Sequence, residues 1–309
     1  MIRTVCLNPA LDKTVQVPDF KIDAVSRITE SRIDAGGKGI NVSKVIRELG
    51  GTSVAYALVA GAAGRKLEEG VRAAGIDLVA QHIEGETRTN LKVVDSLNHT
   101  NTDINEPGPK VRQVDLDELL ARLISDIEEG DTVVLAGSLP SGAPVDTYAS
   151  WTAACKVAGA RVFLDADGAV FNAAIEVGPT LVKPNDHELA QVVGRRLSDI
   201  HQIEEAAHEL MEGGVGYVVV SMGGEGALFV APDKTVRAHS PKVKVGSTVG
   251  AGDSVVAAIA YALDTGLSLE DTIRLSMATG AANVMQSGTQ AAPRELVDSL
   301  INQVTMEEL

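Results

Sequence analysis

The sequence predicts an α/β protein in which helices cover both faces of a mostly parallel sheet and a small β-strand lid lies beside it. Short β-branched runs predict strands at 132–135, 161–164, 181–183 and 217–220, and the segments between them, such as 115–129, 145–158 and 198–212, have helical periodicity. Such alternation is typical of βαβ units. In these sheets ligands bind beyond the carboxyl ends of the strands.

Two segments interrupt the alternation and predict the lid. Residues 11–34 include Val15–Val17, and residues 86–105 include an alternating run from Thr89 to Val94 before a polar stretch. Both resemble exposed antiparallel strands. Because each soon returns to the helical pattern, we interpret them as excursions from one domain. The expected core is therefore 1–10, 35–85 and 106–309, and the expected lid is 11–34 and 86–105.

Composition limits the classes of partner. The 309 residues suit one large α/β domain with an appendage, and 45% of them are hydrophobic, as in ordinary globular proteins. The net charge of −15 disfavours binding to nucleic acid or to an anionic membrane. A phosphorylated small molecule would therefore need a local cluster of lysine, arginine and backbone N–H groups.

The cysteines and apolar runs give no sign of secretion or membrane insertion. Cys6 and Cys155 have no metal-binding spacing, and the first residues lack a signal-peptide pattern. The longest apolar run, Val255–Leu263, is about half of what a membrane span needs and predicts a buried helix. We expect reduced thiols and a cytoplasmic protein.

The strongest local signal is the segment Ser247–Ser254, between an expected strand at 243–245 and an expected helix at 254–263. Gly250 and Gly252 allow a tight turn whose N–H groups, with Ala251 between them, meet the positive end of the helix dipole. Such a turn predicts an anion hole, and Asp253 would supply a base beside it. The alternative is that Asp253 only caps the helix. This segment alone favours the two roles about equally.

A second glycine-rich segment, 34–42, precedes an expected helix at 43–49. Gly37 lets the backbone approach a ligand, Lys38 adds a positive charge, and Asn41 adds an amide. The spacing is not that of a Walker A loop. An ordinary glycine-rich turn is the alternative.

Two further segments follow predicted strands. In Lys183–Glu188, Asn185 is placed to cap a helix, and Glu188 is either its capping-box partner or an outer-shell Mg²⁺ ligand; the spacing alone favours capping. The turn 221–227 suits close approach by a nucleotide, although such turns are common. No histidine pair has metal-binding spacing, no G-x-S-x-G segment is present, and no G-x-G-x-x-G follows the first strand. Hydrolases and nicotinamide-dependent dehydrogenases are therefore disfavoured.

Together, five segments in order along the chain resemble the ribokinase-like carbohydrate kinases, and within them the phosphofructokinase B subfamily: 36–41, 137–140, 182–188, 220–223 and 248–254. The resemblance implies a three-layer α/β/α core, a β-lid, ATP and Mg²⁺, and often a homodimer formed through the lid.

Segments 7–12, 87–90 and 102–108 are most similar to 1-phosphofructokinases. By that resemblance, sugar hydroxyls meet Asp12, Gly37 and Asn41, the acceptor phosphate meets Lys38 and Arg88, and Ser138 lies near the acceptor. The ATP side would comprise Lys183, Asn185, Ser221, Gly223, Gly226 and Thr248, with Glu188 for Mg²⁺. Gly250, Ala251 and Gly252 would form the anion hole, and Asp253 would be the base.

The implied reaction is ATP-dependent phosphorylation of a ketose phosphate, with fructose 1-phosphate first and tagatose 6-phosphate as the alternative. Some family members that act on 6-phosphosugars carry an arginine about where Asp103 stands, so this chain resembles 6-phosphofructokinases less. A binding protein without catalysis is a further alternative, disfavoured by the intact Asp253 and glycines.

Overall fold

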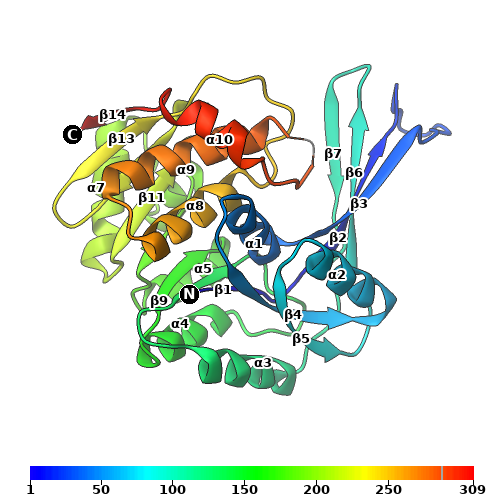
Figure 1. The fold of residues 1–309 in the computed structure, drawn as a ribbon, viewed down its shortest axis with the longest axis horizontal. Helices are drawn as coiled ribbons and strands as arrows, with labels where there is room; N and C mark the ends of the chain where they lie inside the picture. The colour runs from blue at the N-terminus through cyan, green and yellow to red at the C-terminus, as the bar shows by residue number, and fades with distance from the viewer. Residues whose placement is uncertain (287) are drawn as a thin grey trace.

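A ten-stranded sheet organises most of the chain in the computed structural model, which describes residues 1–286 and 288–309 (Figure 1). Its strands, in spatial order, are β14 (Thr305–Glu308), β13 (Thr235–His239), β12 (Ala227–Val230), β11 (Tyr217–Ser221), β10 (Leu181–Val182), β9 (Arg161–Asp165), β8 (Thr132–Ala136), β1 (Ile2–Cys6), β4 (Ser53–Ala60) and β5 (Asp77–Ile83). Neighbours from β5 to β11 pair in parallel, and β11 to β14 pair antiparallel. The predicted mostly parallel sheet is confirmed.

Helices cover both faces of this sheet, which confirms the three layers. One face carries α3 (Gln113–Asp126), α4 (Thr147–Val157), α5 (Gly168–Ile175), α6 (Asp186–Val192) and α7 (Ile200–Glu212); the other carries α1 (Lys38–Glu48), α2 (Gly61–Ala73), α8 (Ala251–Thr265), α9 (Leu269–Val284) and α10 (Arg294–Ile301). Alternate residues of β8 divide between the two cores: Val133 and Leu135 pack in one and Val134 in the other.

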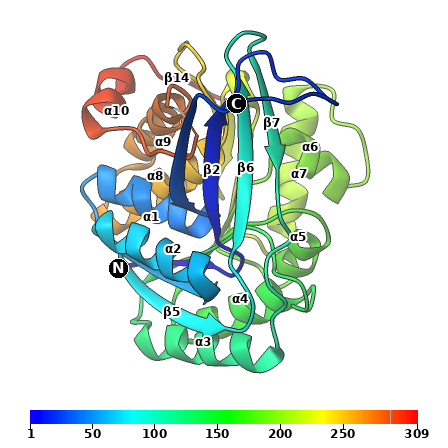
Figure 2. The ribbon, with the colours of Figure 1, turned by 90° about the vertical axis from the view of Figure 1, so that its right-hand side faces the viewer.

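A second sheet forms the lid: it projects from the core in Figure 1 and faces the viewer in Figure 2. Its order is β3 (Glu30–Gly36), β2 (Ala10–Gln16), β6 (Arg88–Asp95) and β7 (Thr100–Ile104). The outer pairs are antiparallel, as expected, but the central pair β2–β6 is parallel. Because β2 and β6 follow parallel core strands, β1 and β5, both leave the same edge of the large sheet in the same direction.

Three local predictions need correction. The expected strand at 243–245 is wrong: no strand of the described residues pairs with this segment, which is irregular, and the N–H groups that follow it, of Gly246 and Ser247, donate to the Val284 carbonyl at the end of α9. The helix expected at 254–263 begins earlier, at Ala251, and the one expected at 43–49 begins at Lys38. Both helices therefore start inside the glycine-rich segments and direct their N-termini at whatever those segments bind.

The remaining predictions concern thiols and membranes. Cys6 and Cys155 are buried free thiols, and Val255–Leu263 lies in α8, where most of the run is buried. Within the described residues, no helix combines the length and the apolar character that crossing a bilayer requires.

Candidate active site

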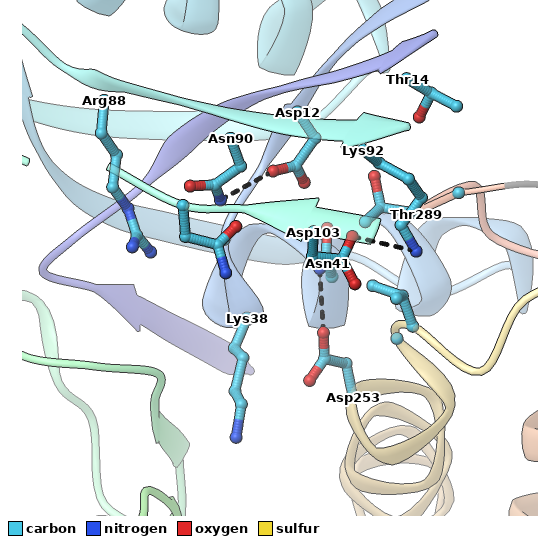
Figure 3. A pocket seen from close by; sticks show the side chains of 15 residues that line it. Asp12, Thr14, Lys38, Asn41, Arg88, Asn90, Lys92, Asp103, Asp253 and Thr289 are labelled. Atoms are coloured by element: carbon cyan, nitrogen blue, oxygen red, sulfur yellow. Dashed lines mark hydrogen bonds and ion pairs between the residues drawn. The ribbon is translucent and has the colours of Figure 1, made fainter. Parts of the chain in front are cut away.

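The carboxylate of Asp253 lies in the first turn of α8, where only 5% of the residue is exposed. Gly250 is the N-cap of the helix and adopts the left-handed conformation, with φ 80°. Because Gly250 occupies the cap, Asp253 is not the capping residue. Its Oδ2 instead accepts a hydrogen bond of 2.9 Å from Nδ2 of Asn41 on α1 (Figure 3). Two predicted site residues, 212 positions apart in sequence, are thus in direct contact.

The surroundings of Asp253 oppose its ionisation. Burial and the negative charge of Asp165 raise its pKa from 3.8 to about 6, while Lys38, the Asn41 hydrogen bond and Lys183 act in the other direction. A carboxyl group with a pKa of about 6 is ionised at neutral pH and is basic enough to accept a proton from an alcohol as that alcohol reacts.

Asp165, at the end of β9, joins the two predicted lysines. Lys38 Nζ lies 3.2 Å and Lys183 Nζ 3.6 Å from Oδ1 of Asp165. Burial disfavours the charged form of Asp165, but the attraction of Lys183 and Lys38 lowers its pKa overall. No sequence motif had indicated Asp165 as a site residue. Its position could have indicated a role: it is the acidic last residue of a buried parallel strand, and such sheets bind ligands at that edge.

The turn at 250–252 lies against this charged cluster. A Cβ at Gly252 would be 3.0 Å from Nζ of Lys183, so a larger residue there would push the lysine away from the turn. The N–H groups at the start of α8 and the Lys183 ammonium therefore concentrate positive potential at one place.

A cavity of about 300 Å³ lies between the lid and the N-termini of α1 and α8 (Figure 3). It brings together most of the predicted acceptor residues with the predicted base: Asp12, Gly37, Lys38, Asn41, Arg88, Gly250 and Asp253. Lid and loop residues that the sequence analysis did not assign also line it: Thr14, Asn90, Lys92, Asp103, Asn105, Val249, Gly288 and Thr289. Thr14, Asn90, Lys92 and Asp103 lie on the strand faces that alternation turns inward, and the strand registers were needed to find them.

Hydrogen bonds hold the lid side of this cavity. Asn90 Nδ2 donates to Oδ1 of Asp12 over 3.0 Å, which links the two central lid strands. Any side chain at Gly36 would collide with the Asp12 carboxylate, because a Cβ there would be 2.0 Å from Oδ2. Burial raises the pKa of Asp12 despite these contacts. Asp12 is therefore fixed in position by glycine and amide neighbours.

An adjoining cavity of about 220 Å³ contains Ser138 and shares Lys38 and Arg88 with the first. Arg88 donates from Nε and Nη2 to the Asn8 carbonyl and from Nη1 to the Glu106 carbonyl. Asn8 Nδ2 in turn lies 3.3 Å from Oγ of Ser138. The structure thus brings the two predicted cations and the predicted serine to one end of the site.

A third cavity, of about 520 Å³, lies on the other side of the 248–252 turn. It collects the predicted nucleotide residues Asn185, Ser221, Gly223, Gly226 and Thr248, together with Ala251 and Gly252. Its deeper wall is apolar and includes Val243, Val255 and Met277. Lys183 is not on this wall but behind the turn, beside Asp165. A flat, largely apolar ligand with an anionic tail would fit this shape and charge.

Glu188 has a structural role that the sequence predicted. Its N–H donates to Oδ1 of Asn185, and its Oε2 accepts from the N–H of Asn185, both over 2.8 Å, so the capping box is confirmed. Within residues 1–286 and 288–309, no cluster of three or more acidic, histidine or cysteine side chains has the geometry of a metal site.

Comparison with known proteins agrees with this geometry. The chain is 40% identical over 309 residues to a 1-phosphofructokinase of Rhodobacter capsulatus, covering 100% of this chain and 98% of that one, and 31% identical over 312 residues to a tagatose-6-phosphate kinase of Staphylococcus epidermidis, covering both fully. A crystal structure of phosphofructokinase-2 from Escherichia coli with substrates and products superposes with a TM-score of 0.94 at 31% identity, over 98% of each chain. Another structure of that protein is of its tetrameric inhibited form.

The family model of the pfkB carbohydrate kinases matches residues 7–295. That span includes every predicted site residue, both cavities beside Asp253 and all four lid strands. The chain therefore belongs to the pfkB family of carbohydrate kinases.

Proposed function

We propose that this ATP-dependent sugar kinase phosphorylates the 6-hydroxyl of fructose 1-phosphate, giving fructose 1,6-bisphosphate and ADP. One observation carries the proposal: the buried carboxylate of Asp253 faces the acceptor cavity, while the turn that precedes it borders the cavity suited to a nucleotide. The full-length similarity to a protein named 1-phosphofructokinase supports the choice of sugar.

Asp253 is the proposed general base. The O–H proton of the acceptor passes to the Asp253 carboxylate as the hydroxyl oxygen forms a bond to the γ-phosphorus, and the bond to the β–γ bridging oxygen breaks with its electrons retained by ADP. Asn41, which donates to Oδ2, fixes the carboxylate so that its other oxygen meets the hydroxyl. Asn41 is thus a positioning residue as well as a candidate for binding sugar hydroxyls.

The turn at Gly250, Ala251 and Gly252 is the proposed anion hole. Charge builds on the equatorial oxygens of the transferred phosphoryl group, and N–H groups at a helix N-terminus stabilise such charge without reorganising. Lys183, behind Gly252, adds a positive charge that Asp165 holds in place.

Mg²⁺ is the expected companion of ATP, and the residues present fit it. Oδ2 of Asp165 is buried without a hydrogen-bond partner among the described residues, so it offers an acceptor for a cation or its bound water. Mg²⁺ keeps several waters and uses few protein ligands beside substrate phosphates, so one or two carboxylates suffice. We propose Asp165 and, through water, Glu188 as its protein contacts. The bound ion would neutralise phosphate charge.

The acceptor is proposed to lie with its phosphate at the Arg88 end. Arg88, Lys38 and Ser138 converge there, and Asp12, Gly37 and Asn41 line the middle of the cavity, where sugar hydroxyls would lie. The phosphate and the reacting hydroxyl would then occupy opposite ends of the acceptor.

The deciding experiment measures ADP release with fructose 1-phosphate, tagatose 6-phosphate, fructose 6-phosphate, ribose and adenosine. The highest kcat/KM is expected with fructose 1-phosphate. Strong turnover of ribose or adenosine, with none on any sugar phosphate, would reject the proposal. Asp253→Ala should abolish turnover while ATP binding persists, and unchanged turnover would show that the base is another residue.

Tagatose 6-phosphate is the second candidate acceptor, because a tagatose-6-phosphate kinase is 31% identical over this whole chain. It places a phosphate at one end and a primary hydroxyl at the other, as fructose 1-phosphate does. The same panel separates the two sugars.

The lid is also a proposed dimer surface. Ile33 and Ile104, 41% and 52% exposed, end a row across its outer face that also contains Lys13 and Leu91. Light scattering should show a dimer that the double change Ile33→Lys with Ile104→Lys dissociates. Val157→Lys, at a 90% exposed site on the core, is the control. A monomeric wild-type chain would refute this part of the proposal.

A further inference from the structure

Lys92 and Asp103 form an ion pair on the lid side of the acceptor cavity. They are register partners on the antiparallel strands β6 and β7, and Lys92 Nζ lies 3.5 Å from Oδ1 of Asp103. Both residues line the cavity, and the Lys92 side chain is only 13% exposed. Lys92 also borders a connected cavity of about 280 Å³ beside Thr14 and Gly288. A cation therefore faces the acceptor site at a second place, away from Arg88.

The two cationic places differ in charge balance. Arg88 lies across the cavity from Lys92 (Figure 3), and its hydrogen bonds go to two neutral carbonyl groups. Arg88 has no carboxylate within ion-pair distance in the described ranges, 1–286 and 288–309, whereas the charge of Lys92 is matched by Asp103. Arg88 therefore offers an unmatched positive charge to a phosphate dianion, and Lys92 a matched one.

This asymmetry matters for a ketose phosphate. In its ring form the two exocyclic carbons at either end of the sugar resemble each other, and only one carries phosphate. If both ends of the cavity attracted a phosphate dianion, the sugar would also bind with its phosphate at Lys92. That mode would remove the primary hydroxyl from Asp253, so the complex would be unproductive.

We propose that Asp103 is a specificity-determining residue, because its charge neutralises Lys92. The acceptor cavity then has a single phosphate-binding position, at Arg88, and the Lys92–Asp103 pair binds sugar hydroxyls. The proposal rests on the proposed ketose-phosphate acceptor. A lysine ammonium and a carboxylate together offer a donor and an acceptor, which suits a hydroxyl group and not a dianion.

Asp103→Asn tests this directly, because it removes the charge and keeps the size. Unproductive binding lowers kcat and KM by the same factor and leaves kcat/KM unchanged, a pattern that loss of lid structure does not produce. A reduction of about fivefold in both is expected, the upper range for a partly exposed ion pair. Inorganic phosphate should also inhibit the variant competitively, at concentrations about fivefold below those that inhibit the wild type.

Adding Lys92→Met to Asp103→Asn should restore kcat and remove the added phosphate inhibition, because the second phosphate site is lost; KM should rise, because the hydroxyl contacts of the pair are lost too. Lys66→Met, at an exposed position on α2 outside the lid and the cavities described above, is the control and should change neither effect. If Asp103→Asn leaves kcat, KM and phosphate inhibition unchanged, the pair is only a surface contact and the proposal fails. It also fails if Lys92→Met alone raises the KM for the sugar phosphate as much as Arg88→Leu does, because Lys92 would then bind the phosphate.

Calorimetry with inorganic phosphate separates this proposal from the proposed function, because it needs no turnover. Tighter phosphate binding by Asp103→Asn than by the wild type would support the inference that Asp103 prevents phosphate binding at Lys92, whichever sugar is the acceptor. Equal binding by both proteins would overturn it. Failure of every ketose phosphate as a substrate would overturn the proposed function and leave the phosphate result standing.

Discussion

Replacing Asp253 with asparagine is expected to stabilise the folded chain while it removes activity. The folded protein holds the carboxyl group at a pKa of about 6, against 3.8 without the fold, because burial and Asp165 oppose its charge. The folded state therefore binds the proton more tightly than the unfolded state does. The resulting loss of stability is absent below pH 4, grows as the pH rises towards 6, and is complete above it.

At pH 8 the ionised carboxylate destabilises the fold by about 3 kcal/mol, taking 1.36 kcal/mol for each pH unit between the two pKa values. Asp253→Asn removes that cost, and its amide oxygen keeps an acceptor for Asn41. For a chain of this length the change corresponds to a rise of about 5 °C in melting temperature. Activity should fall about a hundred- to ten-thousandfold, because the base is lost.

Urea unfolding of both proteins at pH 5 and pH 8, with ADP release assayed in parallel, checks this prediction. The stability difference at pH 5 should be about half of that at pH 8. Asp233→Asn, in an exposed turn, is the control and should change neither quantity. A variant that is less stable than the wild type at pH 8, or equally stabilised at both pH values, would refute the account of Asp253 as a buried carboxylate whose ionisation destabilises the fold.

Three further changes probe the site. Asn41→Leu removes the hydrogen bond that lowers the pKa of Asp253, so the acid limb of the kcat/KM profile should move up by about one pH unit; an unmoved limb would contradict this. Arg88→Leu should raise the KM for the sugar phosphate at least tenfold with little effect on the KM for ATP, and the reverse pattern would assign Arg88 to the nucleotide. Gly226→Ala places a Cβ 1.9 Å from the Ala238 carbonyl at φ 105°, so ATP affinity or folding should fail, as calorimetry and circular dichroism would show. Normal ATP binding would mean that the backbone of this turn can shift to accommodate the added methyl group.

Much of the fold was predictable because its signals are local. The buried parallel strands are short β-branched runs, and the capping box at Asn185 and Glu188 is a four-residue pattern that the structure reproduces. The strand expected at 243–245 is absent for a related reason. β-branched residues favour strands, but a strand also needs a neighbouring strand, and none among the described residues pairs with this segment.

Some site residues could likewise be predicted from local sequence, and others could not. Lys38, Asn41 and Asp253 lie in glycine-rich segments at helix N-termini, which are visible in sequence. Lys92 and Asp165 were missed because their importance depends on long-range placement: Lys92 on strand register in the lid, and Asp165 on two lysines that meet it from α1 and from the end of β10. Spacing along the chain does not determine such contacts.

The parallel pairing at the centre of the lid also has a consequence for how the chain folds. β2 and β6 pair residues that are about 80 positions apart, and the chain between them contains α1, β4, α2 and β5. Closing so long a loop is entropically unfavourable until the intervening elements are compact. Each outer hairpin is able to form by itself, but the four-stranded lid is completed only after α1, β4, α2 and β5 have packed together. Amide protons shared by β2 and β6 should accordingly gain protection from exchange later in refolding than those between β1 and β4.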